Sequence, residues 1–432
     1  MYDLGILNGK IYLDGNFLNA NLYIKSGKIY DISTNFHKCR KELDASGKVI
    51  LPGFIDPHVH FELNLGKYTS VDDFESGSIS ALFGGVTTII DFLDPISKVE
   101  ELEPFFNKRL NLAKKSLVDF SFHTTLGTFY GDLNNLIEKI KNLGTNSIKV
   151  FTAYSSSKRR TNDKTLFHLF EISKEFKIPI LIHAENEDMI TENVPIKIHS
   201  KARPEISEIS EIIKIAELLY QTKGTAYIVH TTCGTSVEEI KNRFDEIFNK
   251  NIFIESCPHY FYFDDSIYDS KKGYLFTMTP PLRSAKEKEK LKNNIDNIFS
   301  IGTDHCSFNS KEKRKRKTGN LPMGIGGIEH SFVLMYSLFN EKIIDKFTIN
   351  PAKFFGLYPQ KGTLLPGADA DIVIFNPDFK GRIEETHTKA DYDLYINTPI
   401  KGKIEKVFKN GVLVIDKNKF VNKVKGKFLR RL

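Results

Sequence analysis

The chain has 432 residues, of which 41% are hydrophobic and 27% are charged. This balance is typical of globular proteins and excludes collagen-like, coiled-coil and wholly disordered chains. At about 100–200 residues per domain, the length predicts two or three domains. The 61 basic and 54 acidic residues leave a net charge of +7, which is too mild over this length to require a nucleic-acid partner.

The cysteines and the apolar segments indicate where the protein works. Four cysteines are scattered along the chain without a CxxC pair, which is typical of a reducing compartment. The first fifteen residues, MYDLGILNGKIYLDG, lack the basic and then apolar pattern of a signal peptide. The apolar runs are too short to span a bilayer. We therefore expect a soluble, cytoplasmic protein with no membrane partner.

Both ends of the chain are rich in predicted strands. Residues 4–33 form short strand patterns separated by turn dipeptides such as Asn8-Gly9. Residues 370–377 predict one strand, and residues 406–415 predict two strands around an Asn-Gly turn. The sequence pattern between the two ends is different. We therefore expect both ends to contribute strands to one small composite β-sandwich domain.

The middle of the chain alternates between apolar, strand-like segments and helical periodicity. Helical patterns occupy residues 71–83, 208–221 and 235–248. The expected strands lie within residues 49–61, 87–92, 118–125, 147–153, 178–185, 226–232, 251–257 and 297–304. This alternation predicts an α/β fold, a (β/α)₈ TIM-type barrel. A doubly wound open sheet is the competing architecture, but no Gly-rich phosphate loop follows the first strand.

These patterns together divide the chain into three segments. We expect residues 1–50 to form the N-terminal part of the β-sandwich, residues 51–362 the barrel, and residues 363–432 the rest of the sandwich with a basic tail. The charge run KEKRKRK at 311–317 predicts a solvated loop. The tail KVKGKFLRRL, residues 423–432, is expected to be disordered or docked on a neighbouring subunit.

Catalytic residues of such a barrel lie at the carboxyl ends of its strands. The first strand ends in His58-Val59-His60, and residues two apart on a strand face the same side, so both imidazoles can reach one metal ion. Lys149 lies inside the apolar fourth strand. Burial lowers the pKa of an amine and makes it nucleophilic, so that it can take up carbon dioxide and become a carbamate able to bridge two metal ions.

Three further polar residues follow the same rule. His183 and His230 end the fifth and sixth strands, and Asp304 ends the eighth. Each of them alone is as compatible with a structural role as with metal binding. Together with the first histidine pair and the lysine, they provide nitrogen and oxygen ligands suited to Zn²⁺ or a similar divalent ion. His305, Cys257 and Cys306 have no visible acyl-transfer partners, and we expect no chemical role for them.

Several segments resemble the cyclic amidohydrolases, above all their dihydropyrimidinase/hydantoinase branch, which is related to the dihydroorotases. The resemblance covers nearly the whole chain. It rests on the segments PGFIDPHVHF, SVDDFESGSISALFGGVTTIIDF, IKVFTAY, LIHAENED, ESCPHY, TPPLRS, GTDHCSF and NPAKFFGLYPQKGTLLPGADADIVIFNP. It implies a hydrolase that opens the cyclic amide or imide bond of a dihydropyrimidine or hydantoin ring through a metal-bridging hydroxide.

The resemblance also implies the site residues and the assembly. Two ions, most simply Zn²⁺, would be held by His58, His60, Asp304 and N6-carboxylated Lys149, and by the same lysine with His183 and His230. Asp304 would move a proton from the hydroxide to the departing ring nitrogen, and Tyr154 would donate a hydrogen bond to the oxyanion. Thr279 would contact the ring imide. Homodimers or homotetramers are usual in this family.

The sequence departs from the family pattern in two places. Glu62 stands where dihydroorotases carry an Arg that holds the substrate carboxylate, so we expect dihydroorotate to be repelled. Leu63 and Leu65 would face the substituent outside the ring and favour an apolar or small group. Met323 replaces an Asn whose main chain contacts the ring, which leaves the exact substrate open.

Three other functions remain as alternatives to hydrolysis of a dihydropyrimidine or hydantoin ring. The first is a dihydroorotase, and the second is another cyclic-amide hydrolase such as an allantoinase. The third is a non-catalytic scaffold relative, which would have lost metal ligands, whereas all six ligand positions are filled in this sequence.

Overall fold

Eight parallel strands form the barrel that positions the rest of the chain. The computed structural model describes residues 1–431. The strands follow one another around the barrel in chain order, each paired in parallel with the next. They are β8 (Phe54–Val59), β9 (Val86–Phe92), β10 (Asp119–Thr125), β11 (Ile148–Phe151), β12 (Ile180–His183), β13 (Ala226–Ile228), β14 (Ile252–Ser256) and β15 (Ser300–Ile301). The predicted (β/α)₈ barrel is confirmed.

Backbone contacts just past β15 close the barrel. The N–H of Asp304 donates to the carbonyl of His58 at 2.8 Å, and the N–H of His60 donates to the carbonyl of His305 at 2.9 Å. These two bonds join the first and last strands at their carboxyl ends. They also place the carboxylate of Asp304 beside the two histidines.

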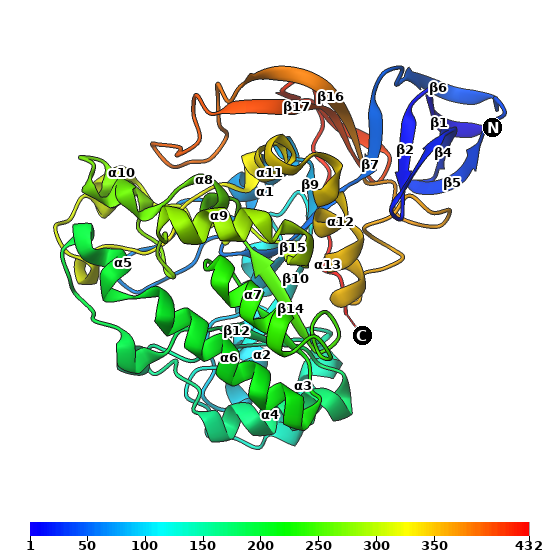
Figure 1. Cartoon of the computed structure of the whole chain (residues 1–432). Helices are drawn as coiled ribbons and strands as arrows, with labels where there is room; N and C mark the ends of the chain where they lie inside the picture. The colour runs from blue at the N-terminus through cyan, green and yellow to red at the C-terminus, as the bar shows by residue number, and fades with distance from the viewer. Residues whose placement is uncertain (432) are drawn as a thin grey trace.

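Helices surround the barrel, and α4, α6, α7 and α9 follow one another around its outside (Figure 1). The first helix of the barrel, α1, begins after Asp73, whose carboxylate accepts N–H bonds from Glu75 and Ser76 in a capping box. The helices are α1 (Phe74–Phe83), α2 (Leu102–Ala113), α3 (Leu133–Leu143), α4 (Asp163–Phe176), α5 (His199–Ala202), α6 (Glu205–Thr222), α7 (Gly234–Arg243), α8 (Pro258–Tyr262), α9 (Ala285–Asn293), α10 (Ser310–Lys313), α11 (Ser331–Phe339), α12 (Ile344–Phe347) and α13 (Ile349–Phe354). The helices predicted at 71–83 and 208–221 correspond to α1 and α6, whereas the helix predicted at 235–248 corresponds to α7 and ends at Arg243.

Strands from both ends of the chain form two further sheets, seen at the top and right of Figure 1. Their orders are β5-β4-β1-β6 and β19-β18-β17-β16-β7-β2-β3. The strands are β1 (Tyr2–Leu7), β2 (Lys10–Leu13), β3 (Asn16–Asn19), β4 (Asn21–Lys25), β5 (Lys28–Ser33), β6 (Cys39–Asp44), β7 (Val49–Pro52), β16 (Ile372–Arg382), β17 (Pro399–Lys409), β18 (Val412–Asp416) and β19 (Lys419–Phe420). Ile6, Leu22, Ile50, Ile374 and Phe408 belong to one buried cluster between them, which confirms the composite β domain.

The apolar segment 49–61 is two strands and not the single strand that the sequence predicts. β7 pairs with β16 and β2 in a terminal sheet, whereas β8 starts the barrel. Gly53 lies between them, and a Cβ at that position would stand 2.2 Å from the hydroxyl oxygen of Thr87. The terminal sheet therefore reaches Pro52, slightly past the predicted boundary at residue 50.

The basic tail folds back on the barrel of its own chain, so the prediction of a disordered or neighbour-docked tail is wrong. The N–H of Phe120 donates to the carbonyl of Lys427 at 3.0 Å, and the N–H of Leu429 donates to the carbonyl of Phe120 at 2.7 Å. Gly426 permits this approach, because a Cβ there would meet the carbonyl of Val118 at 1.8 Å. The tail thus continues the backbone pairing of β10.

Arg431 ends this docked segment in a fully buried position. Its guanidinium donates to Ser121 Oγ at 2.9 Å, to Thr145 O at 3.0 Å, to Ser147 Oγ at 2.8 Å and to the carbonyl of Phe122. The charge of Arg431 therefore lies among buried oxygens of its own chain, and not in a disordered or neighbour-docked tail.

The basic run 311–317 is solvated except at one residue. Lys311 and residues 314–317 are exposed, as predicted. Lys313 is fully buried, and its ammonium donates to the carbonyls of Thr277 at 2.8 Å and Gly324 at 2.5 Å. Burial lowers the pKa of this amine to about 7. The lysine joins two loops, because both carbonyls need a donor in an interior that excludes water.

None of the helices in residues 1–431 combines the length and the apolar character needed to cross a bilayer.

Candidate metal centre

A cavity of about 770 Å³ opens at the carboxyl ends of the barrel strands. All of the residues that the sequence singles out for chemistry or substrate contact line this one cavity. They are His58, His60, Leu63, Leu65, Lys149, Tyr154, His183, His230, Thr279, Asp304 and Met323. Barrel topology brings them together, since the carboxyl ends of parallel strands meet on one face.

His58, His60 and Asp304 form a compact group of possible metal ligands. The Nε2 atoms of the histidines lie 3.2 and 3.1 Å from the same oxygen, Oδ1 of Asp304, and the three ligand atoms all lie within 4.8 Å of one another. Burial raises the pKa of the Asp304 carboxyl, but the two imidazoles outweigh burial and hold it well below its usual value. Asp304 has a φ of 51°, in the left-handed region where strained functional residues are found.

His183 and His230 form a second pair in the same cavity. Nδ1 of His183 lies 3.1 Å from Nε2 of His230, while Nε2 of His183 contacts Oε2 of Glu185 at 2.7 Å. The carboxylate therefore occupies one ring nitrogen of His183 and leaves Nδ1 facing the cavity. Burial lowers the pKa of His183 to about 4 and that of His230 well below its usual value. Both rings are thus neutral, as metal binding requires.

Lys149 lies on β11 between these two groups of ligands in the cavity wall. Its side chain is 2% exposed, and its Nζ lies 5.1 Å from the ring centroid of Phe151 and 5.7 Å from that of Phe92. Burial lowers the pKa of this amine to about 7, so a large fraction is uncharged at neutral pH. Only the uncharged amine can react with carbon dioxide.

The donor set fits a binuclear metal centre. Four imidazoles, one carboxylate and one amine of lowered pKa line this one cavity. The facing donor atoms lie close together: the Nε2 atoms of His58 and His60 approach Oδ1 of Asp304, and Nδ1 of His183 approaches Nε2 of His230. Nitrogen and oxygen donors of this kind suit Zn²⁺ and similar ions.

Glu255 supports this centre and was not identified from the sequence. It is fully buried on β14, and its Oε1 lies 2.8 Å from Nδ1 of His58 and accepts the backbone N–H of His230 at 2.9 Å. Its other oxygen accepts the hydroxyl of Tyr227 at 2.9 Å. One carboxylate thus orients two residues that are candidate metal ligands. The available signal was a charged residue inside the apolar segment NIFIESC, the same signal that singled out Lys149.

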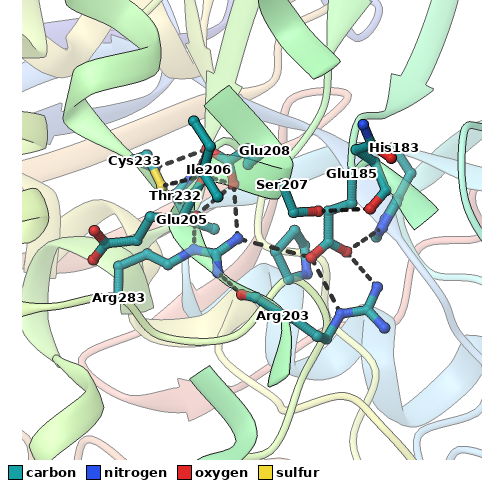
Figure 2. Close-up of polar contacts among 12 residues, drawn as sticks. His183, Glu185, Arg203, Glu205, Ile206, Ser207, Glu208, Thr232, Cys233 and Arg283 are labelled. Carbon is teal, nitrogen blue, oxygen red and sulfur yellow. Dashed lines mark hydrogen bonds and ion pairs between the residues drawn. The ribbon is translucent and has the colours of Figure 1, made fainter. Parts of the chain in front are cut away.

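Glu185 and Arg203 connect the second histidine pair to Tyr154. Figure 2 shows the guanidinium of Arg203 facing the carboxylate of Glu185, which also contacts His183. Nη2 of Arg203 donates to the phenolic oxygen of Tyr154 at 3.0 Å. Tyr154 itself has a φ of 76°. Glu185 lies inside the quoted segment LIHAENED, but the sequence offers no sign that Arg203 folds onto it.

The remaining predicted contact residues lie on loops around the cavity. Leu63 and Leu65 belong to a loop whose Tyr68 hydroxyl donates to the carbonyl of Asn320 at 2.9 Å. Thr279 and Met323 lie on the two loops that Lys313 joins. Glu62 is not among the cavity-lining residues of the described chain. The expectation that its charge would repel dihydroorotate therefore has no support in the geometry.

The three residues for which no chemistry was expected have structural surroundings. His305 lies 3.0 Å from Oδ2 of Asp72, and its Nδ1 accepts backbone N–H groups. Cys306 lines the cavity, but burial raises the pKa of its thiol and of the Cys257 thiol well above the usual value. Both thiols therefore stay protonated and poorly nucleophilic at neutral pH.

Comparisons with known proteins agree with this arrangement. The amidohydrolase family model matches residues 49–414. The chain is 33% identical to a D-hydantoinase of Geobacillus stearothermophilus, with 99% of this chain and 96% of that protein aligned. A D-hydantoinase crystal structure superposes with a TM-score of 0.92 at 31% identity, covering 100% of this chain and 99% of its own. A dihydropyrimidinase from Brevibacillus agri gives 0.92 at 28% identity, with the same coverage.

The family match also bears on the metal. Amidohydrolases generally use a binuclear metal centre, and His58, His60 and Asp304 form a candidate metal-binding group in this chain. The matched region includes the whole barrel and the strands that carry these ligands. The chain belongs to the amidohydrolase family.

Proposed function

We propose that the protein hydrolyses the cyclic amide or imide bond of a hydantoin or dihydropyrimidine ring. The observation that supports this most is the convergence of His58, His60, Lys149, His183, His230 and Asp304 with Tyr154 on one cavity. The relatives described above are D-hydantoinases and a dihydropyrimidinase that align over nearly their full length. Water adds across the ring amide: its oxygen bonds to the carbonyl carbon, and the carbon–nitrogen bond breaks.

The proposed cofactor is a pair of divalent ions, most simply Zn²⁺. His58, His60 and Asp304 would hold one ion and His183 and His230 the other, with Lys149, carboxylated on Nζ, shared between them. When bound, such a pair lowers the pKa of water and polarises the ring carbonyl. The lowered pKa of Lys149 supports this role, since it makes the uncharged amine available for carboxylation.

Asp304 is the proposed proton carrier. The imidazoles of His58 and His60 keep its pKa well below the usual value, so it is a carboxylate at neutral pH and can accept the proton of the attacking water. It would then deliver that proton to the ring nitrogen as the amide bond breaks. Without this transfer the nitrogen would have to leave as a poorly stabilised anion.

Tyr154 is the proposed donor to the carbonyl oxygen on which negative charge develops. Burial raises the pKa of its phenol, so the proton stays in place at neutral pH. Arg203 donates to the phenolic oxygen, which fixes the ring and leaves the O–H free to point into the cavity. Thr279 and Met323 would contact the ring, and Leu63 and Leu65 its substituent.

A substrate panel tests the proposal. It contains 5,6-dihydrouracil, hydantoin, 5-substituted hydantoins, dihydroorotate and allantoin. Turnover of dihydrouracil or hydantoins with two divalent ions per chain is the expected result. Turnover of dihydroorotate alone would move the protein to the dihydroorotase branch. No turnover of any ring after zinc and bicarbonate supplementation would contradict the enzymatic function and favour a scaffold role.

We further infer a cytoplasmic homodimer or homotetramer without a nucleic-acid partner. Four cysteines that form no disulfide support a reducing compartment. The resemblance to the cyclic amidohydrolases, among which homodimers and homotetramers are usual, supports the oligomeric state. Light scattering coupled to size exclusion measures the oligomeric state directly.

A further inference from the structure

We propose, on the basis of the proposed function, that the preferred substrate is a cyclic ureide whose ring substituent ends in a carboxylate. Arg159 would recognise this group. This differs from the apolar or small substituent that the leucines alone predict. The argument rests on the charges that line the cavity mouth and on the position of the basic run.

Arg159 points into the cavity from the loop that follows β11. Its guanidinium carbon lies 6.0 Å from the ring centroid of Phe151, which is itself 5.9 Å from the ring of Tyr154. The neighbouring Arg160 faces away and pairs with Glu187 at 2.9 Å. Arg159 forms no ion pair with any carboxylate of residues 1–431. A guanidinium with free donors beside a reaction site is suited to a planar anion.

The wall around Arg159 suits a short chain that ends in a charge. Leu63, Leu65, Leu93 and Pro95 line the same cavity and can cover methylene groups between the ring and the anion. Lys67 also lines the mouth, and no carboxylate in the described part of the chain pairs with it. The rim contains one exposed carboxylate, Glu192, which Ser156 contacts at 3.5 Å. Solvent screens that charge strongly because it is exposed.

The basic run 311–317, which the fold leaves largely solvated, leads directly into the cavity wall. Lys317 is bridged to Pro195, and Thr318, Gly319 and Asn320, which follow it, all line the cavity. Residues 314–317 are exposed and positively charged, and they directly precede this part of the cavity wall in the chain. Clustered charge of one sign attracts oppositely charged substrates and raises their association rate in a salt-dependent way. The position of the run thus favours anionic substrates for the same cavity.

The test compares hydantoin-5-acetate with its uncharged isostere hydantoin-5-acetamide. The native protein should have the higher kcat/KM for the acid. In Arg159→Gln the acid-to-amide ratio of kcat/KM should fall by about 10- to 100-fold, the range of a charge-assisted hydrogen bond. The ratio within one variant cancels any general loss of active protein. The matched control is Lys158→Gln, which removes the same charge from an exposed neighbour outside the cavity and should leave the ratio within about three-fold.

A second arm examines the basic run. The triple variant Lys315→Gln, Arg316→Gln and Lys317→Gln should reduce the salt dependence of kcat/KM for the acid and not for the amide. A native protein that prefers the amide, or an equal loss of ratio in Lys158→Gln, would overturn the proposal. Unsubstituted hydantoin distinguishes failure of this proposal from failure of the proposed function. Turnover of hydantoin without acid preference refutes only the anionic substituent, whereas no turnover of any ring refutes the proposed function itself.

Discussion

Replacing Glu255 by Gln removes one negative charge from beneath the proposed metal centre and leaves the shape of the side chain unchanged. Oε1 of Glu255 faces Nδ1 of His58 at 2.8 Å and the N–H of His230 at 2.9 Å, and a Gln carbonyl can keep both bonds. The Gln amide would then face Tyr227, whose hydroxyl can accept from it and donate to Ser300 Oγ, 2.5 Å away. The perturbation is therefore mainly electrostatic.

The expected magnitude follows from what the charge does to His58. Burial lowers the pKa of this imidazole, but Glu255 and Asp304 outweigh burial and raise it to about 9. A carboxylate on Nδ1 makes the opposite nitrogen a stronger ligand, and loss of such a partner typically weakens metal affinity about 10- to 100-fold. That range corresponds to about 1.4–2.8 kcal/mol of binding free energy.

Competition between the apoprotein and a chromophoric chelator for Zn²⁺ measures this affinity directly. The matched control is Glu287→Gln. Glu287 is also buried and accepts from Thr235 at 2.7 and 2.8 Å, but unlike Glu255 it forms no hydrogen bond to His58 or His230 in the described residues. Unchanged zinc affinity in Glu255→Gln, or an equal loss in Glu287→Gln, would refute the assignment of Glu255 as a support for the metal ligands.

Three further substitutions test other parts of the structure. Lys149→Ala should abolish activity and bring bound metal below two ions per chain, measured by elemental analysis, and full activity would refute the carbamate. Arg203→Met should lower kcat at least about 10-fold, because Tyr154 loses the bond that orients it; Arg203→Lys should recover part of that loss. Arg431→Met should lower the free energy of unfolding by about 2–4 kcal/mol in denaturant titration, since buried carbonyls lose their donor; unchanged stability would contradict a structural role for the tail.

The sequence predicts the barrel and the cavity residues because both depend on local patterns. Strand-like apolar segments contain Lys149 or end near His58, His183 and His230, and barrel topology brings the carboxyl ends of such strands together. These strand patterns do not predict the position of Arg203. It contacts Glu185 and Tyr154 from a loop that precedes α6, and no periodicity indicates where a loop side chain will lie.

The contacts of the C-terminal tail could not be predicted from local patterns either, because they join residues far apart in the chain. Composition shows only that KVKGKFLRRL is basic, yet Arg431 is buried against residues that lie 286 and 310 positions earlier in the chain. The acceptors of its guanidinium are backbone carbonyls and hydroxyls, which carry no charge signature in the sequence. Lys313 is buried for the same reason, since its partners are the carbonyls of Thr277 and Gly324.

The mixed terminal sheet constrains when this domain can fold during synthesis of the chain. β7 pairs on one side with β2 and on the other with β16, so one edge of this early strand has no partner until residues 372–382 have been synthesised. Throughout synthesis of the barrel, that unpaired edge is open to incorrect pairing with other strands. Ribosome-bound chains that stop within the barrel should therefore engage chaperones through their N-terminal strands and release them once β16 emerges.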